Sequence, residues 1–324
     1  MIGRGYKRTL VFSEENGFGN LVDADTFIPI QVPFFSCTIS ETRNLEKSEI
    51  IRGSRHRNKP INSDTVVDGD VVVPLDYNYL GLWLGKAIGR GMVTGTTAPY
   101  SHMFTPRDEI TSFALEHGLE EPPYYGLFKG LKINSIGLDL GDQQEVKLNF
   151  GIMGKEEILS GNKNLVTPAQ SKYAFKQFYG YQATIQENGL PIATVTKCSI
   201  NITNNIDELR SIGNMGKCAD LIEGFVDVTG TITALFDSQV LWMKAKEGMK
   251  SSLEIFFDAG DNTHSLKISI PELLFKQGQK LDGQAGLLVE FPFEAYYENN
   301  LLNSSIVFQL KNNIDNYGNE DNMN

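Results

Sequence analysis

The sequence has few cysteines and histidines, and it lacks the motifs in which either residue usually binds metal. Its three cysteines include no Cys-x-x-Cys pair, so neither a disulfide framework nor a zinc knuckle is predicted. No His-Glu-x-x-His motif occurs, and no two histidines are four residues apart. We therefore predict no metal site and no cofactor. The residues concerned are Cys37, Cys198, Cys218, His56, His102, His117 and His264.

Long hydrophobic runs are absent as well. No stretch of 18 or more apolar residues occurs, so no membrane-spanning helix is predicted. The apolar stretch after the basic N-terminus covers only Leu10 to Phe12, which is too short for a secretory signal. We expect a soluble protein that is made in a cytoplasm and has no membrane partner.

The sequence also lacks the signatures of common enzymes. Gly-x-Ser-x-Gly does not occur. The acidic segment Asp258–His264 lacks the spacing of a calcium loop and predicts a hairpin turn instead. Asp139, Asp142 and Glu145 surround a glycine, and a turn between strands explains them equally well. We predict no catalytic residue; an enzyme on a β-scaffold would need convergent carboxylates or a nucleophile with its base.

Positive charge is less abundant than negative charge, with 29 Lys and Arg against 40 Asp and Glu. The formal net charge is −11, which argues against a protein that grips nucleic acid across its surface. The one basic run, Lys47 to Lys59, lies in a long loop between two expected strands and contains Arg52, Arg55, Arg57 and Lys59. A contact with an acidic neighbouring subunit is the hypothesis for these four residues. A nucleic-acid patch and a merely solvated loop are the alternatives.

What the sequence does contain is a long internal repeat. The segment Cys37–Glu46 returns as Cys198–Asp207, 161 positions later, and at the same offset Gly69 falls on Gly230 and Asp76 on Asp237. A period this long indicates two copies of a whole domain. We expect a first domain at 1–160, a second at 161–310 and a disordered polar tail at 311–324.

The hydrophobic pattern of both copies predicts a mainly β fold of two tandem, similar β-sandwich or barrel domains, each with one α-helix. A capped amphipathic helix is expected from Asp76 to Ile88, and a second from Asp237 to Glu247 that Gly248 ends. Most aromatic side chains, including Tyr296 and Tyr297, are expected in the core. Strands are expected at Phe35–Ser40, Thr65–Pro74, Thr111–Leu115, Tyr125–Leu140, Gln144–Met153, Val226–Phe236, Ser252–Phe257, Ser265–Ile270 and Leu287–Tyr297.

Five segments, taken in order, carry a resemblance to a known family. They are Val67–Leu84, Tyr124–Asp139, Glu145–Lys155, Lys197–Asn204 and Val228–Asp237. From about residue 25 to residue 300 the chain resembles the tail tube proteins of long-tailed phages, of the type with two fused tube domains. The competing hypothesis is a β-rich tail-tip or baseplate module that recognises a host surface ligand through an exposed aromatic groove.

The resemblance implies a structural virion protein that forms rings around a lumen, stacked into a tube through which DNA is ejected. Hexameric family rings imply homotrimeric, pseudo-hexameric rings for a fused double domain. Four lumen strands in each of six domains, at ~4.8 Å spacing and ~40° tilt, give a circumference of about 150 Å and a bore of roughly 30 to 40 Å. Acidic side chains would keep duplex DNA from sticking, although the sequence does not identify the lumen-lining residues. The implied partners are further copies of the chain, the tape measure protein, the tail terminator and distal tail proteins. In such a stack, the Lys47 to Lys59 loop, with Arg52, Arg55, Arg57 and Lys59, is expected to reach the next ring.

Overall fold

The computed structural model describes residues 4–23, 27–89, 91–141, 145–165, 172–192, 195–214, 216–235, 240–281, 287–299, 302–317 and 320–322. Within these ranges the chain is mainly β, as the sequence predicted, and holds two α-helices, α1 (Leu80–Ala87) and α2 (Val240–Glu247). Neither helix is long and apolar enough to cross a membrane.

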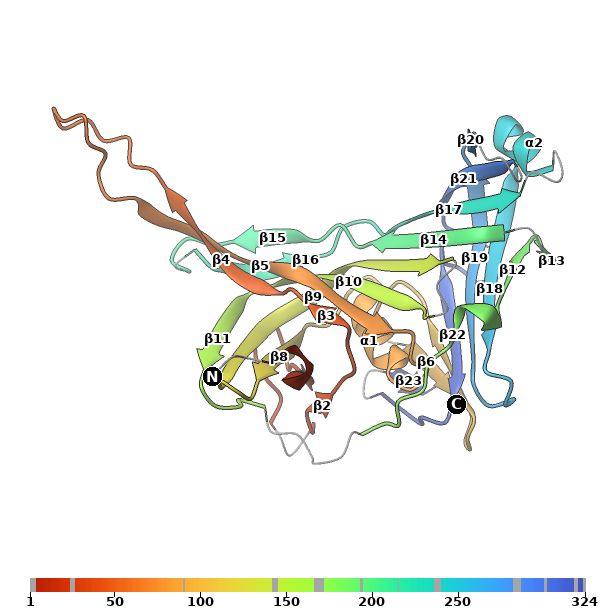
Figure 1. Cartoon of the computed structure of the whole chain (residues 1–324), viewed down its shortest axis with the longest axis horizontal. Coiled ribbons are helices and arrows are strands. Elements are labelled where there is room, and N and C mark those ends of the chain that lie inside the picture. Colours follow the sequence, from red (N-terminus) through yellow and green to blue (C-terminus); the bar gives the residue numbers. More distant parts are fainter. Residues whose placement is uncertain are drawn as a thin grey trace.

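One antiparallel sheet runs through the whole molecule (Figure 1). It has eight positions, of which four come from the first half of the chain and four from the second. In spatial order the strands are β3 (Ser36–Cys37) with β4 (Ser40–Glu46), β5 (Ile61–Pro74), β10 (Lys147–Gly154), β9 (Tyr124–Leu140), β14 (Val195–Thr203), β17 (Asp227–Leu235), β21 (Leu288–Ala295) and β20 (Gln279–Leu281). There are eight positions because β3 and β4 share the first one, and the end of the long strand β19 (Ser265–Phe275) together with the short strand β20 forms the last.

Each half adds a second sheet that shares its long strand. In the first half this sheet is β2 (Ile30–Gln31), β1 (Arg8–Glu14), β8 (Phe113–Leu119), the start of β9 and β11 (Glu156–Ser160). In the second half it is β13 (Leu190–Pro191), β12 (Ala183–Glu187), β18 (Lys250–Asp258), β19 (Ser265–Phe275) and β22 (Val307–Asn312). Beyond β22 it continues through β7 (Tyr100–Phe104), β6 (Gly91–Thr94) and β23 (Glu320–Asn322), so residues from early in the chain join the later sheet.

The strand pairing repeats along the chain with the offset seen in the sequence. Cys37 pairs with Val71 in the first half, and 161 positions later Cys198 pairs with Ile232. Further along the same ladders, Ser40 pairs with Asp68 just as Asn201 pairs with Thr229. A register shift of one residue would turn every side chain to the other face of the sheet. The conserved offset therefore means that matching residues of the two halves lie on matching faces.

Elements outside those ladders correspond too. A short 3₁₀ turn precedes the first strand of each second sheet, at Gly5–Lys7 before β1 and at Gly180–Gln182 before β12. The β8–β9 ladder breaks register after Phe113, and the β18–β19 ladder breaks at the matching place after Ser251. The correspondence thus covers the order of the elements, their pairing and one irregularity.

Helix α1 forms the centre of the first half. Trp83 stacks on Phe150 with ring centroids 5.1 Å apart. The sequence predicted an amphipathic helix, but all eight residues of α1 are buried. Even Lys86 is buried; its Nζ lies 2.5 Å from a carboxylate oxygen of Glu14. The second sheet and the C-terminal segment cover the sides that the sequence pattern had left for solvent.

Asp76 caps the turn that leads into α1, as its position in the sequence predicted. One carboxylate oxygen accepts bonds from the backbone N–H groups of Asn78 and Tyr79 at 2.8 and 2.9 Å, and the other accepts one from Lys176. Burial raises the pKa of Asp76 to about 6 despite these bonds. In the second half, α2 ends at Gly248, whose φ of +63° suits glycine. The expected cap at Asp237 lies outside the described residues.

The prediction of a disordered tail is wrong for residues 311–317. Tyr317 has an exposed fraction of 0%, and its ring lies where a side chain on Gly81 of α1 would otherwise point. Asn312 is also fully buried and donates to the backbone oxygen of Tyr77 at 2.6 Å. The sequence signal failed because a single aromatic side chain anchors an otherwise polar segment.

Candidate assembly interface

The face of the eight-stranded sheet that points away from α1 is exposed and carries small polar side chains. Residues directly opposite each other across an antiparallel ladder share a face. Asn149 lies opposite both Val72 and Gly137, and Gly137 lies opposite Asn201, so one row crosses four strands. Part of this face is a hollow of about 800 Å³. We call it the concave face.

The concave face is acidic. Following the registers from strand to strand places six carboxylates and three lysines on it within the described strands. Lys147 lies over the ring of Phe35, 4.6 Å from its centroid, and Glu294 pairs with Lys276, just beyond β19, at 2.9 Å. The acidic residues are Asp68, Asp70, Asp139, Asp227, Glu290 and Glu294, and the lysines are Lys132, Lys147 and Lys197.

Both ends of the eight-stranded sheet are open. The outer edge of β3 and β4 and the outer edge of β20 have no partner strand among the described residues. Unpaired edges expose backbone N–H and C=O groups that another strand can bind. The two edges are therefore candidate contact sites.

A junction of the same kind already exists inside the chain. Strand β14 of the second half pairs with β9 of the first half, from Cys198 opposite Leu140 to Thr203 opposite Ser135. This ladder fuses the two halves into one sheet. It shows how the first strand of one half binds the last strand of another.

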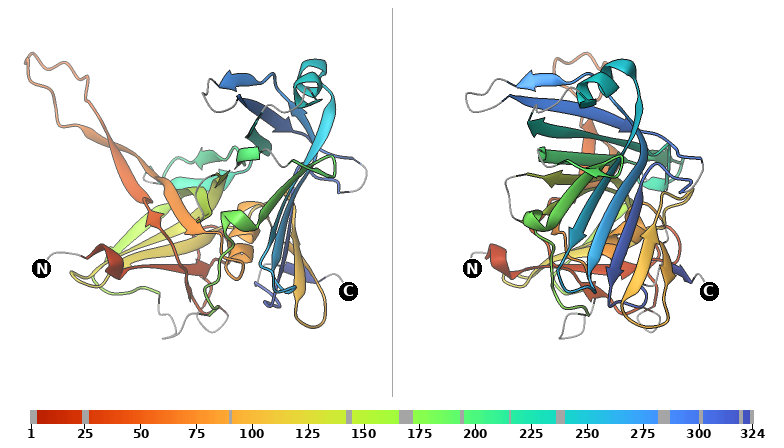
Figure 2. Two further views of the ribbon diagram at one scale, coloured as in Figure 1. Left: turned by 45° about the vertical axis from the view of Figure 1, so that its right-hand side comes forward. Right: turned by 90° about the vertical axis from the view of Figure 1, so that its right-hand side faces the viewer.

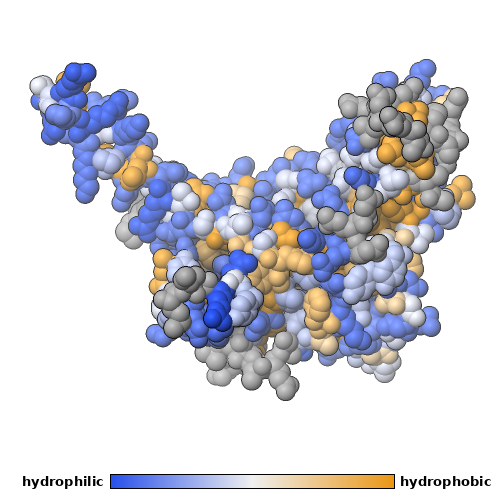
Figure 3. Space-filling model, in the orientation of Figure 1, coloured by the Kyte–Doolittle hydropathy of each residue, from blue (hydrophilic) through white to orange (hydrophobic). Residues whose placement is uncertain are grey.

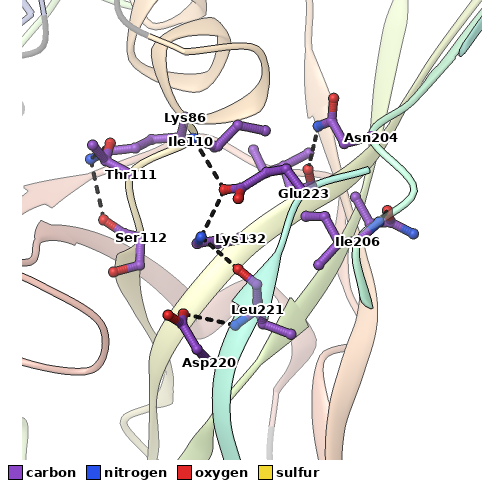
Figure 4. A network of polar contacts seen from close by, with 12 residues as sticks. Lys86, Ile110, Thr111, Ser112, Lys132, Asn204, Ile206, Asp220, Leu221 and Glu223 are labelled. Atoms are coloured by element: carbon purple, nitrogen blue, oxygen red, sulfur yellow. Dashed lines mark hydrogen bonds and ion pairs between the residues drawn. The ribbon is translucent and has the colours of Figure 1, made fainter. Parts of the chain in front are cut away.

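A hairpin of the second half lies across the first half next to this junction (Figure 4). It consists of β15 (Asp207–Arg210) and β16 (Cys218–Ile222). The Nζ of Lys132 on β9 donates to the backbone oxygen of Leu221 at 2.7 Å and lies 2.7 Å from a carboxylate oxygen of Glu223. The side-chain amide of Asn204 donates to the backbone oxygens of Ala87 and Ile133, both at 2.7 Å.

Apolar burial and one ion-pair cluster complete the docking of this hairpin. Ile206, Cys218 and Leu221 are buried together against Phe18 and Met153. In the loop between β15 and β16, the backbone oxygen of Gly216 accepts a hydrogen bond from the backbone N–H of Thr65 on β5 at 2.9 Å. The hairpin is thus held by apolar and polar contacts at once.

Glu156 binds the same hairpin through charge. Its two carboxylate oxygens lie 2.5 Å from Lys217 of the hairpin and 2.9 Å from Lys129 of β9. Burial works to raise the pKa of Glu156, but the hydrogen bonds from these two lysines outweigh it and hold the pKa below its ordinary value. The carboxylate therefore stays ionised at neutral pH.

The matching hairpin of the first half has no such support. We call residues 43–62 at the tips of β4 and β5 the arm. Glu46 pairs with Ile61 in the arm, just as Asp207 pairs with Ile222 in the docked hairpin, so the two loops have equal length. The arm stands away from the body in Figures 1 and 2. Figure 3 shows it as a mainly hydrophilic projection with a few apolar patches.

The four basic residues predicted as contact residues all lie on this arm. Arg52, Arg55, Arg57 and Lys59 are exposed. From residue 43 to residue 59 the arm has six Lys and Arg against two Glu, a net +4, which leaves −15 for the rest of a chain whose total is −11. The structure brings the four residues together at one tip and places no described body residue around them.

A groove of about 640 Å³ with exposed aromatic side chains lies on the second half, next to Pro106, Arg107 and Asp108, which also line it. Its lining includes Phe225, Tyr296 and Tyr297, with exposed fractions of 90%, 37% and 59%. Most aromatic side chains were expected in the core, and the two tyrosines are exceptions because they follow directly after β21 and leave the sheet. The repeat is the sequence signal that could have pointed to the groove. It aligns Phe225 with Asp64, the neighbour of Thr65, whose backbone N–H binds the docked hairpin.

The residues considered for chemistry are dispersed. His102 is buried with Nε2 2.9 Å from the backbone oxygen of Ile314, whereas His56 is exposed on the arm. Asp258–His264 forms the expected turn, in which Asp261 accepts from the N–H groups of Thr263 and His264, both at 2.9 Å. Burial raises the pKa of Cys198 to about 12. Across the described ranges no three His, Cys, Asp or Glu side chains are grouped to hold a metal ion.

Open antiparallel sheets with free edges define a β-rich structural protein. A family model described as Phage tail tube protein matches residues 5–295, and the chain belongs to this family. The protein is therefore a structural, non-enzymatic component of the virion tail that assembles with other tail proteins into a tube. No curated protein matches the chain. The matched range begins at the first residue of the 3₁₀ turn before β1.

Proposed function

We propose that three copies of the chain form a closed, pseudo-hexameric ring, and that such rings stack into the tube through which double-stranded DNA leaves the capsid. The observation that carries the proposal is the repeated strand register, Cys37 with Val71 and Cys198 with Ile232. It supports two tube domains, at 1–160 and 161–310. Eight sheet positions in each chain match the 24 lumen strands that a bore of roughly 30 to 40 Å requires.

The concave face is the proposed wall of the lumen. Six carboxylates against three lysines on its strands give it an excess of negative charge. Within a Debye length of about 8 Å such a wall repels phosphates, so DNA passes without specific binding. The chain is made in the host cytoplasm, and its tube binds the tape measure protein inside, the tail terminator at one end and distal tail proteins at the other.

Electron microscopy of the purified chain at rising concentration tests this function. End-on class averages of hollow rings or tubes with three-fold or apparent six-fold symmetry are expected. Compact monomers at every concentration would contradict the proposal. That result would favour the second candidate, a tail-tip or baseplate module, for which the exposed aromatic groove at Phe225 and Tyr297 is the supporting observation.

The lumen assignment has its own test. Asp70→Lys, Asp139→Lys and Glu290→Lys together replace three acids of the concave face by bases. Tubes of this variant should retain duplex DNA at low salt and release it as salt rises, whereas wild-type tubes should not retain it. Equal DNA retention by both tubes would mean that the concave face does not line the lumen.

A further inference from the structure

We infer that the contact between neighbouring copies repeats the contact between the two halves of one chain. In this inference, which rests on the proposed ring, the arm of one copy docks in the aromatic groove on the second half of its neighbour. The β3–β4 edge of the first copy then continues into the β20 edge of that neighbour. The occupant of the groove is therefore a second copy of this chain.

The first support is the exposure of matching residues. Ile206 of the docked hairpin has an exposed fraction of 6%, whereas its counterpart on the arm, Leu45, is 63% exposed. At the hairpin tip the counterparts agree, because Ile212 and Ile51 are exposed at 108% and 96%. The arm thus exposes an apolar residue at the position where the docked hairpin buries one, and the two tips behave alike.

The second support is the chemistry of the groove. Thr65, Lys132 and Glu156 contact the docked hairpin, and they correspond in the second half to Val226, Leu274 and Tyr297, of which Val226 and Tyr297 line the groove. The hairpin residues that make these contacts are Gly216, Lys217, Leu221 and Glu223. Their counterparts on the arm are Arg55, His56, Pro60 and Asn62, so one guanidinium group lies among the residues that would meet the groove. Guanidinium groups pack well on aromatic faces.

The third support is the free edges. The internal ladder places Asn201 opposite Gly137. At one end of the sheet, Ser40 on β4 is the counterpart of Asn201. At the other end, Gln279 on β20 is the counterpart of Gly137, because Gly137 lies opposite Asn149, Gln279 lies opposite Glu290, and Asn149 and Glu290 are counterparts. The inferred ladder therefore puts Ser40 of one copy opposite Gln279 of the next. The backbone of the lumen wall then continues from one copy to the next.

Disulfide cross-linking of the full chain tests this register. Ser40→Cys with Gln279→Cys should give disulfide-linked chains under oxidation, with bands up to three chains on non-reducing gels. Gly137→Cys with Asn201→Cys is the matched control within one chain; a side chain at Gly137 meets nothing closer than 3.7 Å. Ser40→Cys with Lys280→Cys, one residue out of register, should cross-link poorly.

The arm contact is tested by Leu45→Asp, with Ile51→Asp as the control at a position that stays exposed after docking. Leu45→Asp should raise the concentration needed for ring formation by about tenfold or more, and Ile51→Asp should leave it unchanged. Two results would overturn the inference but not the proposed function. One is normal ring formation by both variants. The other is rings in which the Gly137–Asn201 cross-link forms but the Ser40–Gln279 cross-link does not. A wild-type chain that never assembles would overturn the proposed function and the inference with it.

Discussion

The arm and the β15–β16 hairpin occupy matching places in the two halves, yet one stands free and the other is docked. Their loops have equal length and their end pairs, Glu46 with Ile61 and Asp207 with Ile222, match. They differ in sequence, because the arm is rich in arginine, and in whether a neighbouring half lies beside them within the chain. This difference is the basis for inferring that the arm binds a second copy of the chain.

Reversing the charge of the arm should have the largest effect on tube assembly. Arg52→Glu, Arg55→Glu and Arg57→Glu should leave single chains folded, because all three side chains are exposed, but should shorten or abolish tubes. Electron microscopy of the assembled material measures the effect. Arg4→Glu, Lys163→Glu and Lys246→Glu change the net charge equally at exposed body positions and should still give tubes. Unchanged tubes in the arm variant would refute its role.

Truncating the two matching apolar residues should separate folding from assembly. Ile206→Ala removes side-chain atoms buried between hairpin and body, and should lower the free energy of unfolding by about 3 kcal/mol. Leu45→Ala should change it by less than about 0.5 kcal/mol in the monomer, because Leu45 is 63% exposed. Urea denaturation of the unassembled chain measures both. A large loss for Leu45→Ala would mean that the arm is already docked within one chain.

The left-handed residue before the docked hairpin offers a smaller test. Asn205 has a φ of +48° and donates to the backbone oxygen of Phe225 at 2.8 Å. Asn205→Val puts a β-branched residue in the left-handed region and should cost about 1 to 3 kcal/mol in the free energy of unfolding. Asn44→Val, at the matching place in the arm, should leave the monomer unaffected. Thermal unfolding of both variants measures this. An equal loss of stability in both would contradict the difference between the docked hairpin and the arm.

Acid should loosen the docked hairpin slightly. The folded pKa of Glu156 is depressed, so its contribution is present above the unfolded pKa of about 4.5 and is lost as pH falls through the lower folded value. Partial exposure and screening keep the effect below about 1 kcal/mol. Amide exchange of residues 207–222 should therefore accelerate below pH 4.5 in wild type but not in Glu156→Gln. The arm, without this ion pair, should show no such change.

Much of the fold could be predicted from the sequence, because periodicity and repeats are local signals. The strands around Val71 and Ile136 and the turn capped by Asp76 follow directly from spacing and residue type. Strand β1 was missed, since its segment Arg8–Glu14 shows no clear alternation and is buried through most of its length. The burial of Tyr317 depends on a contact with α1 that no local pattern contains.

The candidate interface was predicted only in part. The basic residues of the arm stand out by composition, but their isolation from the body depends on tertiary structure. The concave face could not be identified because its serines, threonines and scattered acids, such as Asp70 and Asp139, resemble any solvent-exposed strand face until the registers align them. Phe225 and Tyr297 were hidden for the opposite reason, since aromatic residues next to strands usually lie in the core.

The most direct test of the central claim is the mass of the smallest closed ring, measured by native mass spectrometry. If the contact between copies repeats the contact between halves, six halves close the ring, and three chains of 36.1 kDa should be found. A ring of six chains, or open chains of indefinite length, would contradict the account.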